Sequence, residues 1–372
     1  MKSKIKKNLK KIYKIIYLIF NFINNNYSRE NILLKGRHYL DRCLSGELLN
    51  NKNKKYFKNP KISVVIPIYN CQNSIKSVIR SIQNQKMFKI EILLVNDNSK
   101  DNSLKIIQII KKEDKRIGII NNKKNMGTLF SRSIGVLKSR GEYIFPLDND
   151  DMIFNNDIFN IVYKEAKNYN YDIIGFQAVQ ANNYYDNITK IKNGCHMHYH
   201  NFIITKKELS SYVISKKYNE VHIWSKLIKA SLYKKAIKAL GKERYSLFMS
   251  WAEDTSMLFI LFYFADSYRY ITKYGIFRYN RKNSASFKMP DSHKLFGEIF
   301  FLDIIFDFTK NTIKHKKFSV YKAIQIRKSR LFKSLNKMSK TYLIIVLKKI
   351  LLSIFINNED KKIIKKTFEG FI

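Results

Sequence analysis

The chain has few cysteines, prolines and glycines for its length. Its 372 residues include only three cysteines, at positions 43, 71 and 195, and their spacing indicates no disulfide framework. A chain without disulfides favours a reducing compartment, so we expect a cytoplasmic protein. With 12 Gly and 4 Pro among abundant Asn, Lys and Ile, the composition indicates an AT-rich genome.

Acidic residues are also scarce. Only 29 Asp and Glu stand against 70 Lys and Arg, which gives a formal net charge of +41. An excess of this size is the electrostatic signature of nucleic-acid-binding proteins. However, no nucleic-acid-binding motif is present, and the basic residues are spread along the chain. We therefore expect no nucleic-acid partner and keep a basic nucleic-acid-binding protein as the alternative.

No apolar run near the N-terminus is long enough to predict a transmembrane helix. The stretch at residues 12–23 is short and is interrupted by Lys14 and Asn21, and it lacks the cleavage site of a signal peptide. Its Lys-rich start favours an amphipathic helix on an anionic membrane surface, and a helix packed on the rest of the protein is the alternative. We expect helical extensions over residues 1–58 and 291–372, with peripheral membrane contact.

Strand-like and helix-like segments alternate from residue 61 to residue 148. Apolar runs rich in β-branched residues, at 61–68, 90–95, 116–120 and 142–146, have the composition of buried parallel strands. Segments with helical periodicity separate them, at 74–84, from 104 onward and at 128–138. This alternation predicts βαβ units and an α/β fold with a mostly parallel sheet. Ligands bind such sheets beyond the carboxyl ends of the strands, where Tyr69, Asp97 and Asp148 fall.

Three carboxylates, Asp148, Asp150 and Asp151, stand within four residues at the end of the fourth strand-like run. Like charges this close together repel one another unless a cation lies between them. Carboxylates suit hard divalent ions such as Mg²⁺ or Mn²⁺, which leave coordination positions for substrate phosphates. From this segment alone, a solvated acidic turn that caps the next helix is the alternative.

Five segments in this order resemble the motifs of family 2 glycosyltransferases with the GT-A fold. They lie at residues 64–70, 95–103, 125–135, 141–151 and 251–254, and the resemblance covers roughly residues 61–286. One departure is Asn96, where the family commonly carries another acid, whereas Asp97 keeps the matching one. The resemblance implies a GT-A domain over residues 59–290, a nucleotide-binding sheet flanked by helices, of the type that builds capsule and surface glycans.

The resemblance also implies an activity and roles for single residues. A hexosyl or N-acetylhexosaminyl group would pass from a nucleotide sugar, a UDP-sugar being favoured, to a glycan, lipid-linked or protein acceptor. Donor-binding roles fall on Pro67, Tyr69, Asp97, Asn125 and Asp148. Asp150 would hold Mn²⁺ or Mg²⁺, which stabilises the departing diphosphate. Asp254, before a predicted helix at 255–263, would be the base of an inverting displacement, with a helix cap as the alternative.

Several further residues allow two interpretations. Arg281 and Trp251 are candidate contacts for the diphosphate or the acceptor, and Trp224 and Trp251 fit either sugar stacking or a core. Arg132 fits a phosphate contact, but a salt bridge on the helix surface is favoured. The histidines of residues 195–200 alternate as in a metal tract, yet zinc sites draw ligands from more than one segment, so a structural or acceptor-loop role is favoured. The retained acids argue against an inactive protein of this fold.

Overall fold

The computed structural model describes most of the chain between residues 55 and 279. The described ranges are 34–38, 41–42, 55–181, 192–193, 201–206, 209, 222–249 and 251–279, with positions 297, 300, 301, 304, 307 and 308. Arg281, the histidine segment 195–200 and most of both predicted terminal extensions lie outside these residues. Within them, no helix has the length and apolar character needed to cross a membrane.

In the described part of the chain, ten strands form one sheet, in the order β3-β2-β1-β4-β9-β6-β10-β5, with β7 paired to β6 and β8 paired to β10. The strands are β1 (Ile62–Ile68), β2 (Ile90–Asn96), β3 (Ile117–Asn121), β4 (Tyr143–Pro146), β5 (Met152–Ile153), β6 (Ile173–Ala181), β7 (Lys192–Asn193), β8 (Phe202–Thr205), β9 (Lys226–Lys229) and β10 (Ser267–Tyr279). Strands β1, β2, β3, β4, β6 and β10 run in one direction, and the other strands run against them. The predicted mostly parallel sheet is confirmed.

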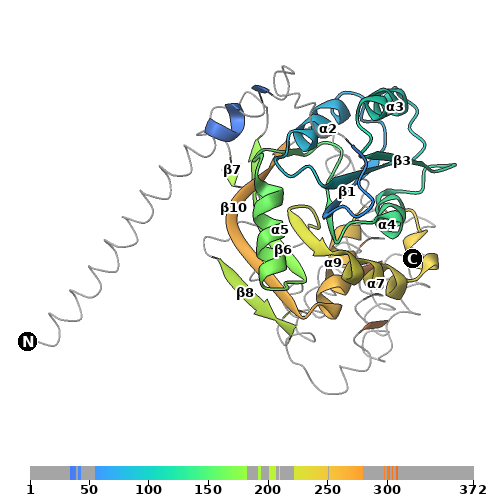
Figure 1. The fold of residues 1–372 in the computed structure, drawn as a ribbon. Coiled ribbons are helices and arrows are strands. Elements are labelled where there is room, and N and C mark those ends of the chain that lie inside the picture. Colours follow the sequence, from blue (N-terminus) through green and yellow to red (C-terminus); the bar gives the residue numbers. More distant parts are fainter. Residues whose placement is uncertain are drawn as a thin grey trace, which may run out of the picture.

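Helices cover both faces of the sheet (Figure 1). They are α2 (Ile75–Gln83), α3 (Ser103–Glu113), α4 (Thr128–Lys138), α5 (Ile158–Asn168), α7 (Ala230–Leu240), α8 (Lys242–Tyr245) and α9 (Glu253–Phe264). In β1, Val64 and Ile66 pack in the core with α2, α3 and α5, whereas Val65 packs in the core with α4, α7 and α9. Successive side chains of a strand point to opposite faces, so β1, whose seven residues are all buried, is covered on both sides.

The predicted elements of the first half of the domain match the structure closely. Strands β1 to β4 and helices α2 and α4 lie within one residue of their predicted bounds, and α3 begins one residue before the predicted start at 104. The predicted helix at 255–263 begins earlier, because α9 starts at Glu253 and places Asp254 in its first turn. The sequence did not indicate β9, which enters the sheet antiparallel between β4 and β6.

Helix α4 packs directly against β1 and β2. A Cβ atom at Gly135 would lie 2.5 Å from Cγ1 of Val65 and 3.0 Å from Cγ2 of Val95. Both valines are fully buried, so neither has free space into which to move. The missing side chain at position 135 therefore sets how closely α4 approaches the sheet.

We expect Gly135→Ala to lower the free energy of unfolding. Overpacking a filled core costs about 1–3 kcal/mol, which exceeds the gain of roughly 1 kcal/mol from replacing glycine by alanine in a helix. The measurement is the urea midpoint, with Gln108→Ala on the exposed side of α3 as control. A Gly135→Ala protein as stable as the wild type would show that α4 moves readily from the sheet.

Candidate active site

The loops after β1, β2 and β4 meet at one edge of the sheet. Strand β1 pairs in parallel with both β2 and β4, so the carboxyl ends of the three strands lie together. Tyr69, Asp97 and Asp148 follow these strands directly or within two residues. The predicted convergence of the three polar segments on one edge is confirmed.

Reciprocal hydrogen bonds join the loops after β1 and β2. The backbone N–H of Asn70 donates to Oγ of Ser99 at 3.2 Å, and the backbone N–H of Lys100 donates to Oδ1 of Asn70 at 2.8 Å. Asn70 has a left-handed backbone, with φ 46°, which asparagine tolerates better than most residues. These contacts fix the loop that presents Tyr69, whose side chain is exposed at the edge.

Asp97 is buried and holds the neighbouring loop. Its Oδ1 accepts hydrogen bonds from Nδ2 of Asn122 and the backbone N–H of Met126, and its Oδ2 accepts one from the backbone N–H of Gly127, each at 2.8 Å. The Gly127 N–H also lies 3.1 Å from Oδ1 of Asn125. A carboxylate offers about four acceptor sites, so three bonds leave roughly one for a ligand.

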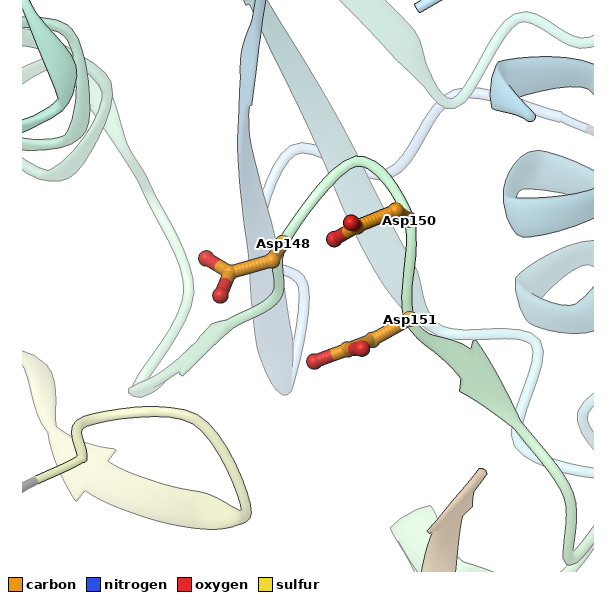
Figure 2. Close-up of side chains that lie close together, drawn as sticks. All are labelled: Asp148, Asp150 and Asp151. Carbon is orange, nitrogen blue, oxygen red and sulfur yellow. The ribbon is translucent and has the colours of Figure 1, made fainter. Parts of the chain in front are cut away.

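Three aspartates form an acidic turn between β4 and β5. The side chains of Asp150 and Asp151 extend from one limb of the turn toward the limb that carries Asp148 (Figure 2). One carboxylate oxygen from each lies within 4.8 Å of the others. Nδ2 of Asn149 donates to the carbonyl oxygen of Pro67 at 3.0 Å and ties the turn to β1. Hard oxygen donors at this spacing suit Mg²⁺ or Mn²⁺.

Arg132 connects the acidic turn to α9. Its Nη2 donates to Oδ1 of Asp148 at 2.8 Å, and its Nη1 donates to Oδ1 of Asp254 at 2.6 Å. Burial raises the pKa of Asp148, Arg132 opposes that rise, and Asp254 adds to it. Arg132 does form salt bridges, but the prediction that they lie on the helix surface is wrong, because Arg132 is only 4% exposed. Arg132 lies three residues after Leu129 and four before Val136, a helical spacing that puts all three on the buried face of α4. This spacing can be read from the sequence.

The first turn of α9 presents two adjacent carboxyl groups. Oδ2 of Asp254 lies 3.4 Å from the backbone N–H of Ile223. Both oxygens of Asp254 thus face groups outside α9, which argues against the helix-cap alternative. Burial raises the pKa of Glu253 to about 8, and the charge of Asp254 adds to the rise. Ala252, with φ 61°, makes the sharp turn into this helix.

Arg278 acts on the acidic turn and packs over one of two stacked rings. The guanidinium of Arg278 lies 5.1 Å from the ring centre of Trp224, which stacks on His222 at 4.9 Å. The positive charge of Arg278 acts on Asp148 and favours its ionised form. Trp224 is buried, which supports a core role over sugar stacking. Trp251 is only partly buried. Arg278 lies in β10, far from Asp148 in the sequence, so the sequence did not indicate that its charge acts on Asp148.

Residues 63–224 match the family model described as glycosyl transferase family 2. The chain carries a family 2 glycosyltransferase domain. Solved structures show the same fold: 84% of this chain aligns with 91% of S. aureus TarS 1-349 in complex with UDP-GlcNAc, at a TM-score of 0.54 and 14% identity. The UDP complex of the same protein gives a TM-score of 0.52 at 15% identity. The predicted GT-A fold is confirmed.

Curated relatives of this glycosyltransferase domain match over part of their length. An uncharacterized glycosyltransferase of Rickettsia bellii is 34% identical over 139 residues, which are 37% of this chain and 20% of that protein. The GalNAc(5)-diNAcBac-PP-undecaprenol beta-1,3-glucosyltransferase of Campylobacter jejuni is 32% identical over 111 residues, 30% of this chain and 36% of that enzyme. The chain therefore spans well under half the length of these relatives.

The raised pKa of Glu253 predicts a pH-dependent stability. Its carboxyl has an ordinary pKa of 4.5 and a folded-state pKa of about 8. Between these values the folded state holds a proton that the unfolded chain releases, so stability falls as the pH rises. From pH 5 to pH 8, we expect wild type to lose at least about 1.4 kcal/mol relative to Glu253→Gln, the equivalent of one pKa unit.

Urea unfolding at pH 5, 6.5 and 8 measures this difference. Glu243→Gln is the matched control, because Glu243 is exposed on α8. Its stability should follow that of the wild type over the whole range. If the free energy of unfolding changed equally with pH in wild type and in Glu253→Gln, the result would contradict the expected protonation of Glu253.

Proposed function

We propose that this protein is a metal-dependent, inverting glycosyltransferase that moves a hexosyl or N-acetylhexosaminyl group from a nucleotide sugar to an acceptor hydroxyl. One observation carries the proposal: Arg132 joins Asp148 of the acidic turn to Asp254 of α9, which lies 122 positions after Arg132 in the chain. The acidic turn and Asp254 therefore belong to one site, as a displacement at a single carbon atom requires.

The donor is proposed to be a UDP-sugar at the carboxyl edge of β1, β2 and β4. The complexes of TarS with UDP-GlcNAc and with UDP support this class of donor. The residues proposed to line the site are Pro67, Tyr69, Asp97, Asn125 and Asp148. All of them lie at this edge or in the loop that Asp97 holds. The unused acceptor site of Asp97 is suited to an N–H of the base.

The acidic turn is proposed to hold Mn²⁺ or Mg²⁺, with Asp150 as the principal ligand. Asp148 donates less readily to a metal, because Arg132 already occupies its Oδ1. The buried carboxylate of Asp151 completes the oxygen-rich donor set. When bound, a divalent ion stabilises the negative charge of the departing diphosphate.

Asp254 is proposed to take the proton of the acceptor hydroxyl. As the hydroxyl oxygen bonds to the anomeric carbon, the bond from that carbon to the diphosphate breaks and the proton passes to the carboxylate. Arg132 binds Oδ1 tightly, whereas the contact of Oδ2 with the N–H of Ile223 is long at 3.4 Å. Oδ2 is therefore the atom best able to accept the hydroxyl proton.

The acceptor is proposed to be a glycan, lipid-linked or protein hydroxyl. The name of the Campylobacter relative, with its undecaprenol-linked substrate, supports a lipid-linked glycan. Such an acceptor fits a cytoplasmic protein with a catalytic domain over residues 59–290 and peripheral membrane contact through its terminal extensions. Trp251, partly buried before α9, and Arg281 are the candidate acceptor or diphosphate contacts.

Incubation with a panel of nucleotide sugars in the presence of Mn²⁺ tests the proposed activity. We expect release of the nucleoside diphosphate from one donor class, and a UDP-sugar first. Nucleic acid added in excess should not compete. Release from no donor, combined with tight salt-dependent binding of nucleic acid, would favour the nucleic-acid-binding alternative instead.

Asp150→Ala should abolish Mn²⁺ binding and turnover together, because the principal metal ligand is lost. Titration calorimetry with Mn²⁺ measures the first effect, and diphosphate release measures the second. Asp266→Ala is the control, since it removes an exposed carboxylate that pairs with Lys206 at the start of β10. Full turnover of the wild type in excess EDTA would refute metal dependence.

Asp254→Asn should reduce transfer by about 10²–10⁴-fold, the usual contribution of a positioned base. Donor affinity should change little, because Asp254 is not proposed to contact the donor. The matched control is Glu253→Gln, the same carboxyl-to-amide change one residue earlier. If Glu253→Gln were inactive and Asp254→Asn active, the base would be Glu253; loss of donor binding in Asp254→Asn would place Asp254 in the donor site.

A further inference from the structure

Arg132 lies among three carboxyl groups in the interior of the site. Asp148 and Asp254 each accept one of its hydrogen bonds, and the carboxyl group of Glu253 also interacts with it electrostatically. The side chain of Arg132 is 5% exposed, against 30% for Asp148 and 16% for Asp254. The buried phenol of Tyr233 on α7 also acts on the guanidinium. The arginine is thus the inner member of the group and the two aspartates face outward.

The guanidinium geometry determines how the two aspartates lie relative to each other. A guanidinium is planar and its N–H groups form a rigid fork, so donors on Nη1 and Nη2 fix two directions at once. Nη2 fixes Oδ1 of Asp148, and Nη1 fixes Oδ1 of Asp254. A lysine ammonium at this position is a point charge without fixed directions, so it cannot impose the same arrangement.

The same contacts and the burial of Arg132 argue against the phosphate role that the sequence left open for it. Each of its Nη atoms donates to an aspartate of this chain, and its Nε is buried. The side chain is only 5% exposed, so a diphosphate would have to enter the interior of the site to reach the remaining N–H groups. The two bonds to the aspartates are charge-assisted, and such bonds are about twice as strong as neutral ones.

We propose that Arg132 is a positioning residue that orients the Asp254 carboxylate for proton transfer and sets its place relative to Asp148. The proposal rests on the proposed function, in which Asp254 is the base. Arg132 itself touches neither donor nor acceptor and acts through Asp254. The turnover number should therefore depend on Arg132 more strongly than donor affinity does.

The first experiment compares turnover and donor-site affinity in Arg132→Gln. We expect kcat to fall by roughly 10- to 100-fold, as for misplacement of a catalytic group by about 1 Å. The Kd of UDP in the presence of Mn²⁺ should stay within about twofold of wild type. Arg132→Lys should recover part of kcat, because one of the two contacts can form again. A Kd that rises as much as kcat falls would assign Arg132 to the donor site and overturn the proposal.

The second experiment combines Arg132→Gln with Asp254→Asn. If Arg132 acts through Asp254, its loss should lower transfer by less than about threefold once the base is gone. A merely structural Arg132 would cost the same factor in both backgrounds, and that result would overturn the proposal. Arg140→Gln is the matched control, since Arg140 pairs with the buried Glu91 away from the site. Its effect on transfer should be equal in both backgrounds.

The urea midpoints of wild type, Arg132→Gln, Asp254→Asn and the double variant separate this proposal from the proposed function. The contact between Arg132 and Asp254 should appear as a non-additive change in unfolding whether or not any sugar is transferred. Non-additive unfolding with no diphosphate release from any nucleotide sugar would refute the proposed function, and the catalytic role of Arg132 with it. Non-additive unfolding with additive effects on transfer would refute only the positioning role.

Discussion

Arg132 carries a positive charge into a buried position between Asp148 and Asp254, and the neighbouring elements are arranged around this contact. Helix α4 reaches it by lying close to the sheet, which Gly135 permits, and α9 reaches it by beginning at Glu253. Leaving a buried charge without its partner costs about 3–5 kcal/mol. The packing of α4 and α9 and the arrangement of the site are therefore coupled, and neither can change without the other.

Several acidic residues in the described part of the chain pair with a cation. Asp114 binds Arg116 in a buried pair, Glu91 binds Arg140, and Asp148 and Asp254 share Arg132. The acidic turn differs, because the carboxylates of three aspartates approach one another within 4.8 Å. A divalent cation bound at this turn would offset much of the repulsion among the three carboxylates.

Backbone strain is concentrated beside the same site. Among the described residues, Ser225 and Ala252 have left-handed backbones although they are neither glycine nor asparagine. This conformation costs roughly 1–2 kcal/mol for such residues, and strain of this kind is frequent at functional sites. Ser225 follows the buried Trp224, and Ala252 directs Glu253 and the next residue toward Arg132. The strained turns thus bring segments distant in sequence to one edge of the sheet.

The sequence by itself determined strands β1 to β4, helices α2 to α4 and the edge shared by Tyr69, Asp97 and Asp148. These features follow from local apolar periodicity and from parallel strands, whose carboxyl ends always lie on the same side. Only the tertiary structure decided that β9 lies between β4 and β6, because that pairing joins strands far apart in the chain. It also decided the partners of Arg132: periodicity places a residue on a buried face, but which carboxylate it meets depends on how α4 and α9 pack together.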